Sequence, residues 1–246
     1  MNKGKKALLV LGASSDVGSE LIALVHAQYD VILAHFYHKN EKIEALREQL
    51  GDRMLLLQAD LSRAEERNQM IAKVKEQEIE DLHIVHMAAP KCKNVKFIKS
   101  DLVDFESQMQ VSVYPVIEVL QALLPDMVKK RTGKVIFMLT AYTRNMPPKY
   151  LSPYVMGKYA LLGLMKSLSA EYAERGITVN AVSPEMMETK FLSEIPELVV
   201  EQSAAGNPMG RNITVAEVIP TFAFLLSEAA DCVTGQNIAV TGVKHS

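Results

Sequence analysis

The sequence predicts an α/β fold with a doubly wound parallel sheet of about seven strands and helices on both faces. Short apolar runs alternate with longer amphipathic stretches along the chain, and several of the short runs are apolar at consecutive positions. Consecutive apolar residues are typical of parallel strands covered on both faces, and strand–helix alternation produces right-handed βαβ units. The 246 residues contain no repeat, linker or low-complexity tract. The chain is therefore expected to form one domain, residues 1–246.

The expected strands are the short apolar runs. The first, ALLVL at residues 7–11, is apolar at every position and is followed by a glycine. Such runs are too short for typical helices and suit buried strands. The full set of expected strands is 7–11, 31–35, 54–58, 83–87, 134–139, 178–182 and 237–240.

The expected helices carry apolar residues at helical spacing. In the first of them, Leu21, Ile22 and Val25 share one side. This pattern indicates a helix with one face on a core and the other in water. The full set of expected helices is 16–29, 63–75, 104–129 and 153–174.

The composition argues against several classes of function. A net charge of −2 without a basic or acidic tail gives no reason to expect a nucleic acid or an anionic membrane as partner. Cys92 and Cys232 lie far apart, and the six histidines lack metal-ligand spacing, so neither a disulfide nor a metal site is expected. The apolar runs are shorter than a membrane span, and the first suits a buried strand rather than a signal core. The expected location is the cytoplasm.

Two motifs follow expected strands and suit a nucleotide. In LGASSDVGSE, residues 11–20, Gly12 and Gly18 bracket a turn that enters a helix, where a pyrophosphate can approach the backbone. Asp60 in QADLS follows the third strand. Its carboxylate suits either the exocyclic amine of an adenine or a helix cap. Ligands of such sheets bind beyond the carboxyl ends of the strands, so both motifs are expected at one site.

Tyr154 and Lys158 lie one helical turn apart at the start of an expected helix and therefore share a face. An ammonium close to a phenol favours the phenolate, so Lys158 is expected to lower the pKa of Tyr154 from about 10. Such a phenol is a usable proton donor near neutral pH. An isolated pair of this kind is more simply explained as a surface tyrosine and a solvated lysine, so the prediction depends on the other motifs.

In their order and spacing these motifs resemble the short-chain dehydrogenase/reductase family, and within it the 3-oxoacyl-acyl-carrier-protein reductases. The resemblance covers nearly the whole chain. It includes Pro184 in VNAVSP, Thr189, PMGR at 208–211 and the TG pair at 234–235. It implies a Rossmann-type fold, a nicotinamide cofactor, and hydride transfer to or from a carbonyl carbon.

The resemblance also implies roles for single residues. Tyr154 is the acid/base, Lys158 orients the nicotinamide ribose, and Ser112 stands where the family has a catalytic asparagine. Thr140 is a further hydroxyl at the expected catalytic centre, and no metal is implied. The implied cofactor-binding residues are Gly12, Ser14, Ser15, Asp16, Val17, Gly18, His38, Lys39, Asp60, Leu61, Ala88, Lys158, Pro184 and Thr189.

The implied cofactor is NADP(H), with NAD(H) as the second choice. NAD-selective proteins of this fold place an acidic residue at the end of the second strand, on the ribose 2′-hydroxyl. Here residues 34–42 read AHFYHKNEK, with His38 and Lys39 and no carboxylate before Glu41. A 2′-phosphate suits these basic side chains, although simple exposure to water explains them as well.

Several positions depart from the family pattern. Asp16 replaces the middle glycine of the glycine turn, and its carboxylate either repels a pyrophosphate, caps the helix or turns outward to solvent. Met87 lies in HMAA, where the family has Asn-Asn-Ala-Gly, and Glu185 replaces a glycine near the expected nicotinamide. Ala141 stands where counting back from the tyrosine places the family's serine, which polarises the substrate oxygen.

Thr140 precedes that position, but neighbouring strand residues point to opposite faces. It would replace the serine only through a bulge or an altered register. Loss of one such donor costs about 100- to 1,000-fold in rate. Tyr150 lies eight residues before Lys158 and suggests an enoyl reductase, which uses a wider spacing and does not rely on the serine. Tyr154 is preferred because one helical turn fixes the pair.

The favoured prediction is an NADP(H)-dependent oxidoreductase acting on a small carbonyl or acyl substrate, such as a 3-oxoacyl compound. The second is a family member with weakened or lost chemistry that serves as a binding or assembly subunit, followed by an enoyl reductase. Residues 188–206 are expected to form a lid. Helices 104–129 and 153–174 are apolar on more than one side, which suits either a homo-oligomer, tetramer or dimer, or burial within one chain.

Overall fold

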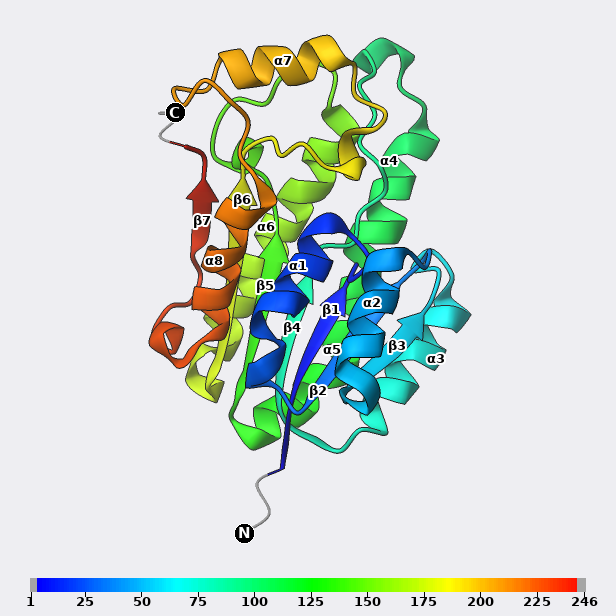
Figure 1. The fold of residues 1–246 in the computed structure, drawn as a ribbon, viewed down its shortest axis with the longest axis vertical. Helices are drawn as coiled ribbons and strands as arrows, with labels where there is room; N and C mark the ends of the chain where they lie inside the picture. Colours follow the sequence, from blue (N-terminus) through cyan, green and yellow to red (C-terminus); the bar gives the residue numbers. More distant parts are fainter. Residues whose placement is uncertain (1–3, 243–246) are drawn as a thin grey trace.

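The protein is built around one seven-stranded sheet (Figure 1). Its structure is a computed structural model that describes residues 4–242. The strand order is β3-β2-β1-β4-β5-β6-β7, and all six neighbouring pairs are parallel. This confirms the predicted fold class. The strands are β1 Lys5–Leu11, β2 Val31–Phe36, β3 Met54–Gln58, β4 Ile79–His86, β5 Gly133–Met138, β6 Ile177–Pro184 and β7 Asn237–Val240.

Helices cover both faces of the sheet, as predicted. One face packs on α1, α2 and α8, which lie in front of the strands in Figure 1, and the other packs on α3, α5 and α6. Helices α2 and α8 had no counterpart among the expected helices. The helices are α1 Asp16–Val25, α2 Glu41–Leu50, α3 Ala64–Lys75, α4 Leu102–Gln108, α5 Tyr114–Lys130, α6 Ser152–Tyr172, α7 Glu197–Ala205 and α8 Val215–Leu226.

Strand β1 shows why its apolar residues are consecutive. Ala7, Leu9 and Leu11 enter the core on one side of the sheet, whereas Leu8 and Val10 enter the core on the other. All five are fully buried. Successive side chains of a strand point to opposite faces, so a strand covered on both sides needs an apolar residue at every position.

The long helix expected at 104–129 consists of three parts. A π-helical turn, Met109–Val113, separates α4 from α5. By length and composition, 102–130 is the one helix among the described residues that could span a membrane, but half of its apolar 18-residue stretch is buried inside the protein. Its buried side chains pack on the sheet, so its apolar character follows from its place in the core.

The strand order reverses direction at β1. From β1 the chain proceeds to β2 and β3 on one side, and it then crosses to β4 on the other. In doubly wound sheets, this switch point opens a crevice at the carboxyl ends of the strands. The residues that follow β1 and β4 therefore border one crevice.

Candidate active site

A cavity of about 740 Å³ lies at the carboxyl ends of the strands. It extends from the turn after β1 to the start of α6 and the lid, and its size is ordinary for a small-molecule site. Of the predicted site residues, Gly18 and Ser112 do not line it. Those that do are Gly12, Ser14, Ser15, Asp16, Val17, His38, Lys39, Asp60, Leu61, Ala88, Thr140, Tyr154, Lys158, Pro184 and Thr189.

The turn between β1 and α1 keeps a tight shape. The Ser15 hydroxyl donates to the Gly12 carbonyl (2.7 Å) and accepts from the Gly18 amide (3.0 Å), which makes Ser15 the N-cap of α1. Gly12 has φ +97°, and a Cβ on it would lie 3.0 Å from the amide nitrogen of Ala88. A Cβ on Gly18 would lie 2.5 Å from the Gly12 carbonyl oxygen. Both glycines are needed for the backbone to pass this closely.

Asp16 neither caps α1 nor turns out to solvent. Its carboxylate accepts from the Lys42 ammonium (2.8 Å) and from the backbone N–H of Lys190 (3.1 Å). Burial raises the pKa of Asp16, but these hydrogen bonds and the two lysine charges outweigh it and hold the pKa below its ordinary value. The carboxylate is therefore a charged link between α1, α2 and the start of the lid.

His35, which was not among the predicted site residues, joins three parts of the site. Its Nδ1 accepts from the Gly12 amide (3.1 Å), so its Nε2 carries the proton and donates to the Ala59 carbonyl (3.1 Å). Burial lowers the pKa of His35 to about 4, despite the hydrogen bond to Ala59. The neutral imidazole thus holds the glycine turn against the chain that leads to Asp60.

We expect the free energy of unfolding to fall as the pH is lowered from about 6.5 towards 4. His35 titrates near 6.5 in the unfolded chain and near 4 when folded, so the unfolded state binds more protons in this window. The stabilising contribution is present above pH 6.5, and its loss by pH 4 should be on the order of 2–3 kcal/mol. Urea unfolding at stepped pH measures it.

A His35→Asn variant is the control, because the amide oxygen still accepts from the Gly12 N–H but does not titrate. The variant should show a shallower pH dependence. Burial also lowers the pKa of His86, to about 3, and of His83, so a residual slope remains. An identical slope in the variant and the wild type would contradict the assignment.

The loop after β2 carries the predicted basic residues. His38 and Lys39 are exposed and line the cavity. The Lys39 ammonium lies 2.8 Å from the Glu44 carboxylate, and the His38 ring is tilted by 46° to the ring of Tyr37, with centroids 4.0 Å apart. The loop thus offers two basic groups to the cavity, one of them already paired.

Asp60 borders the cavity and also closes a turn. Its carboxylate accepts from the Ser62 backbone N–H (2.8 Å) and hydroxyl (2.7 Å). Its own N–H donates to the Glu66 carboxylate (2.7 Å). The side chain thus fixes the turn before α3, whose N-cap is Arg63 and not Asp60, and the expected contact with an adenine stays a prediction.

The first turn of α6 brings Tyr154 and Lys158 to the inner end of the cavity. The Lys158 ammonium donates to the Met138 carbonyl (2.8 Å) and lies 5.6 Å from the centre of the Tyr154 ring. Lys158 is only 4% exposed, and burial lowers its pKa to about 8. The ammonium beside Tyr154 is therefore largely shielded from water.

The predicted effect of Lys158 on the pKa of Tyr154 is wrong in this structure. Burial raises the pKa of the phenol above its ordinary value, and a hydrogen bond with the Thr140 side chain lowers it only in part. The reason is that burial of a phenolate costs more free energy than the hydrogen bond with Thr140 provides. Tyr154 is thus held as a neutral proton donor.

Thr140 occupies the place that counting had given to Ala141. Thr140 lines the cavity and bonds to Tyr154, whereas Ala141 is 1% exposed and does not line it. Strand β5 ends at Met138, and Thr140 is extended and caps the short 3₁₀ helix Ala141–Thr143. Ala141 is the first residue of that helix, and its side chain is buried in the protein. The expectation that only a bulge or an altered register would bring Thr140 to the site is wrong, because the strand ends before Thr140.

Ser112 lies behind the cavity in the π-helical turn. Its backbone carbonyl accepts from His86 Nε2 (2.7 Å), and its buried hydroxyl has no hydrogen-bond partner among the described residues. Burial and the Lys158 charge lower the pKa of His86 to about 3, so its imidazole is neutral. Ser112 is thus held by a buried, neutral histidine that sequence reasoning had not selected, and neither residue lines the cavity.

Tyr150 lies outside the cavity that Tyr154 and Lys158 line. It has φ +72° and is 41% exposed, and the Lys96 ammonium lies 5.9 Å from the centre of its ring. The wider Tyr–Lys spacing that suggested an enoyl reductase therefore has no geometric support here.

The lid contributes an apolar wall beside Tyr154. The rings of Phe191 and Tyr154 have centroids 5.9 Å apart, and Leu192 and Ile195 also line the cavity. Ile195 packs with Leu151 and the buried thiol of Cys92. The wall comes from the segment before α7, whereas Leu198 in α7 itself is largely exposed.

The comparisons with known proteins agree with this geometry. A family model described as enoyl-(acyl carrier protein) reductase matches residues 15–242. Nodulation protein G of a Rhizobium species is 32% identical over 239 residues, which cover 97% of this chain and 96% of that protein. A 3-oxoacyl-[acyl-carrier-protein] reductase FabG of Staphylococcus aureus is 28% identical over 244 residues, 98% of each chain. The chain belongs to the short-chain dehydrogenase/reductase family, whose members are oxidoreductases.

Solved structures show the same fold. ElxO with NADP bound has a TM-score of 0.83 and 21% identity, covering 97% of this chain and 98% of its own. YwfH, described as an NADPH-dependent reductase involved in bacilysin biosynthesis, has a TM-score of 0.85 and 22% identity, covering 98% and 99%. At these identities the likeness concerns the fold.

Proposed function

We propose that the protein is an NADP(H)-dependent oxidoreductase that transfers hydride to or from a carbonyl carbon. The observation that carries the proposal is the meeting of Tyr154, Lys158 and Thr140 at the inner end of a cavity that begins at the glycine turn. A proton donor, a cation and a second hydroxyl are what the reduction of a carbonyl requires beside a hydride source. Relatives described as 3-oxoacyl-[acyl-carrier-protein] reductases support it.

The described residues fit a nicotinamide dinucleotide. The close approach at Gly12 leaves no space for a side chain, and the amides at the start of α1 suit a pyrophosphate. His38 and Lys39 suit a 2′-phosphate, and the structure of ElxO with NADP supports the same choice. When bound, the cofactor supplies or accepts the hydride.

The residues of this chain then perform the acid–base part of the reaction. In the direction of reduction, the Tyr154 hydroxyl donates its proton to the substrate oxygen as negative charge develops there. The Thr140 hydroxyl donates a hydrogen bond to that oxygen or to the Tyr154 phenolate. Lys158, fixed by the Met138 carbonyl, orients the ribose, and the hydrogen bond with the Thr140 side chain favours the phenolate.

The apolar wall indicates the substrate class. Phe191, Leu192, Ile195 and Leu151 border the cavity beside Tyr154, and apolar surface favours burial of a hydrocarbon portion next to the reacting carbonyl. We propose a carbonyl or acyl substrate with such a portion. Assembly into a homo-oligomer, tetramer or dimer, stays a prediction.

We expect NADPH to bind at micromolar concentration and NADH more weakly. The chain contains no tryptophan, so enhanced emission of the bound dihydronicotinamide can be titrated against a low background. Lys39→Gln should weaken NADPH more than NADH, because only NADPH carries the 2′-phosphate. Absence of binding at millimolar NADPH would refute the proposal and favour the second prediction, a binding or assembly subunit that has lost its chemistry.

A further inference from the structure

Lys190, which lies in the lid directly after Thr189, reaches the glycine turn. Its backbone N–H donates to Asp16 Oδ2 (3.1 Å), while Asp16 Oδ1 accepts from the Lys42 ammonium (2.8 Å). This fixes the start of the lid against the first residue of α1. Lys190 and Asp16 border both the main cavity and a smaller one beside it.

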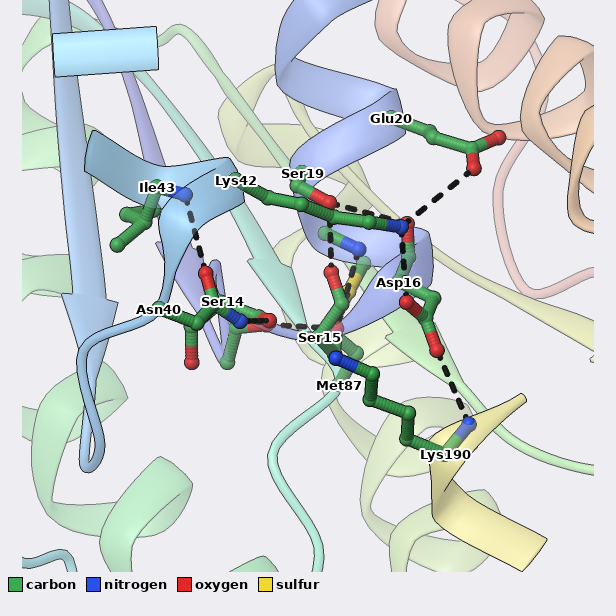
Figure 2. Close-up of polar contacts among 12 residues, drawn as sticks. Ser14, Ser15, Asp16, Ser19, Glu20, Asn40, Lys42, Ile43, Met87 and Lys190 are labelled. Atoms are coloured by element: carbon green, nitrogen blue, oxygen red, sulfur yellow. Dashed lines mark hydrogen bonds and ion pairs between the residues drawn. The ribbon is translucent and has the colours of Figure 1, made fainter. Parts of the chain in front are cut away.

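The contact with Asp16 uses the backbone N–H of Lys190, so the ammonium of Lys190 is not needed for it and can bind another group. Figure 2 shows the side chain extending from the lid towards Ser15 in the glycine turn, away from Lys42. Lys190 is exposed, and it lines the same cavity as Ser14 and Ser15. The ammonium therefore points to the part of the cavity where the start of α1 would receive a pyrophosphate.

The Lys190 ammonium changes the net charge around the glycine turn. Lys42 lies between Asp16 (2.8 Å) and Glu20 (4.0 Å). One ammonium against two carboxylates leaves one net negative charge next to the helix N-terminus, which is unfavourable for an anion. Glu188 adds a further carboxylate to the smaller cavity, and Lys190 adds one positive charge against this excess, which favours an anion at the amides of α1.

We propose that Lys190 is a pyrophosphate-binding residue, aligned by the contact of its backbone with Asp16. Asp16 stands where the family has a glycine, and the lid cation compensates for the carboxylate that this substitution introduces. The inference rests on the proposed function, because it assigns a residue to the dinucleotide of that same site. It also predicts that lid position and cofactor affinity are coupled.

The test is titration of NADPH and NADH into Lys190→Gln. Both nucleotides carry the pyrophosphate, so both should bind about 10- to 100-fold more weakly and by the same factor. Glutamine keeps the backbone N–H that Asp16 accepts, so thermal unfolding should be unchanged. Lys129→Gln, an exposed residue in the last turn of α5 that does not line the cavity, makes the same change of net charge and should bind both nucleotides as the wild type does.

A second substitution separates the charge effect from any structural one. Adding Asp16→Asn to Lys190→Gln removes the carboxylate next to the helix N-terminus while leaving an acceptor for the backbone N–H, so binding of both nucleotides should recover in part. Unchanged affinities in Lys190→Gln would overturn the inference alone. A loss confined to NADPH would also overturn it, because Lys190 would then contact the 2′-phosphate. A wild type that binds neither nucleotide would overturn the proposed function and this inference with it.

Discussion

Tyr154→Phe is expected to lower the rate of carbonyl reduction by about 100- to 10,000-fold, the usual contribution of a positioned general acid. The substitution removes the phenolic hydroxyl from which the proposed reaction takes its proton. It keeps the ring, which packs against Phe191 with centroids 5.9 Å apart. NADPH binding should therefore stay close to that of the wild type.

The measurement is oxidation of NADPH with a set of 3-oxo substrates that carry apolar chains. Tyr159→Phe is the matched control, because Tyr159 lies on the same helix but is 48% exposed. Tyr142→Phe provides a second comparison, since Tyr142 also lines the cavity and burial raises its pKa. An unchanged rate in Tyr154→Phe, or a loss confined to Tyr142→Phe, would remove Tyr154 as the acid.

The fold was predictable because burial on both faces leaves a strong pattern. Every position of β1 from residue 7 onward is buried, and the sequence there is apolar without interruption. Helix α2 was missed because only Ile43, Leu46 and Leu50 are buried in an otherwise polar segment. Helix α8 was missed for the opposite reason, because it is apolar nearly all round and contains Pro220. The capping box that precedes α8 was a signal of its start.

The site was predictable as a set, because the topology brings the ends of the strands together. The polar partnerships within it depend on contacts between residues far apart in the chain. No local pattern indicates that His35 bonds to Gly12, or that Asp16 holds Lys190, 174 positions away. Asp16 was correctly selected as the unusual position, but its effect depends on two lysines that only the folded chain supplies.

The position of the hydroxyl beside Tyr154 differs by one residue from the position expected from its distance to Tyr154 in the sequence. Counting back from Tyr154 places the family's serine at Ala141, and that is valid only if the intervening loop has the family's length. The structure places Thr140 at the cavity and Ala141 in the interior. A difference of one residue reverses the inference, because Thr140 lines the cavity whereas Ala141, the first residue of the 3₁₀ helix, is buried.

Thr140→Val is therefore expected to lower the rate of carbonyl reduction by about 100- to 1,000-fold, the usual cost of losing one hydrogen-bond donor to a developing oxyanion. Valine keeps the branched shape and the Thr140 carbonyl that accepts from the Thr143 N–H (3.0 Å), although it loses the long contact of the hydroxyl with the Tyr142 N–H (3.5 Å). Thr140→Ser retains the hydroxyl and should keep most of the rate. Steady-state kinetics of both variants, with NADPH affinity measured in parallel, separate a loss of chemistry from a loss of binding.

Ala141→Ser is the discriminating control, because it restores the family's residue at the counted position. The structure buries this side chain away from the cavity, so the substitution should not raise the rate, and it should slightly destabilise the protein by placing a hydroxyl in the interior. In Thr140→Val it should not restore activity either. If Ala141→Ser accelerates the reaction while Thr140→Val leaves it unchanged, counting identifies the catalytic position and the hydrogen bond between Thr140 and Tyr154 has no catalytic role.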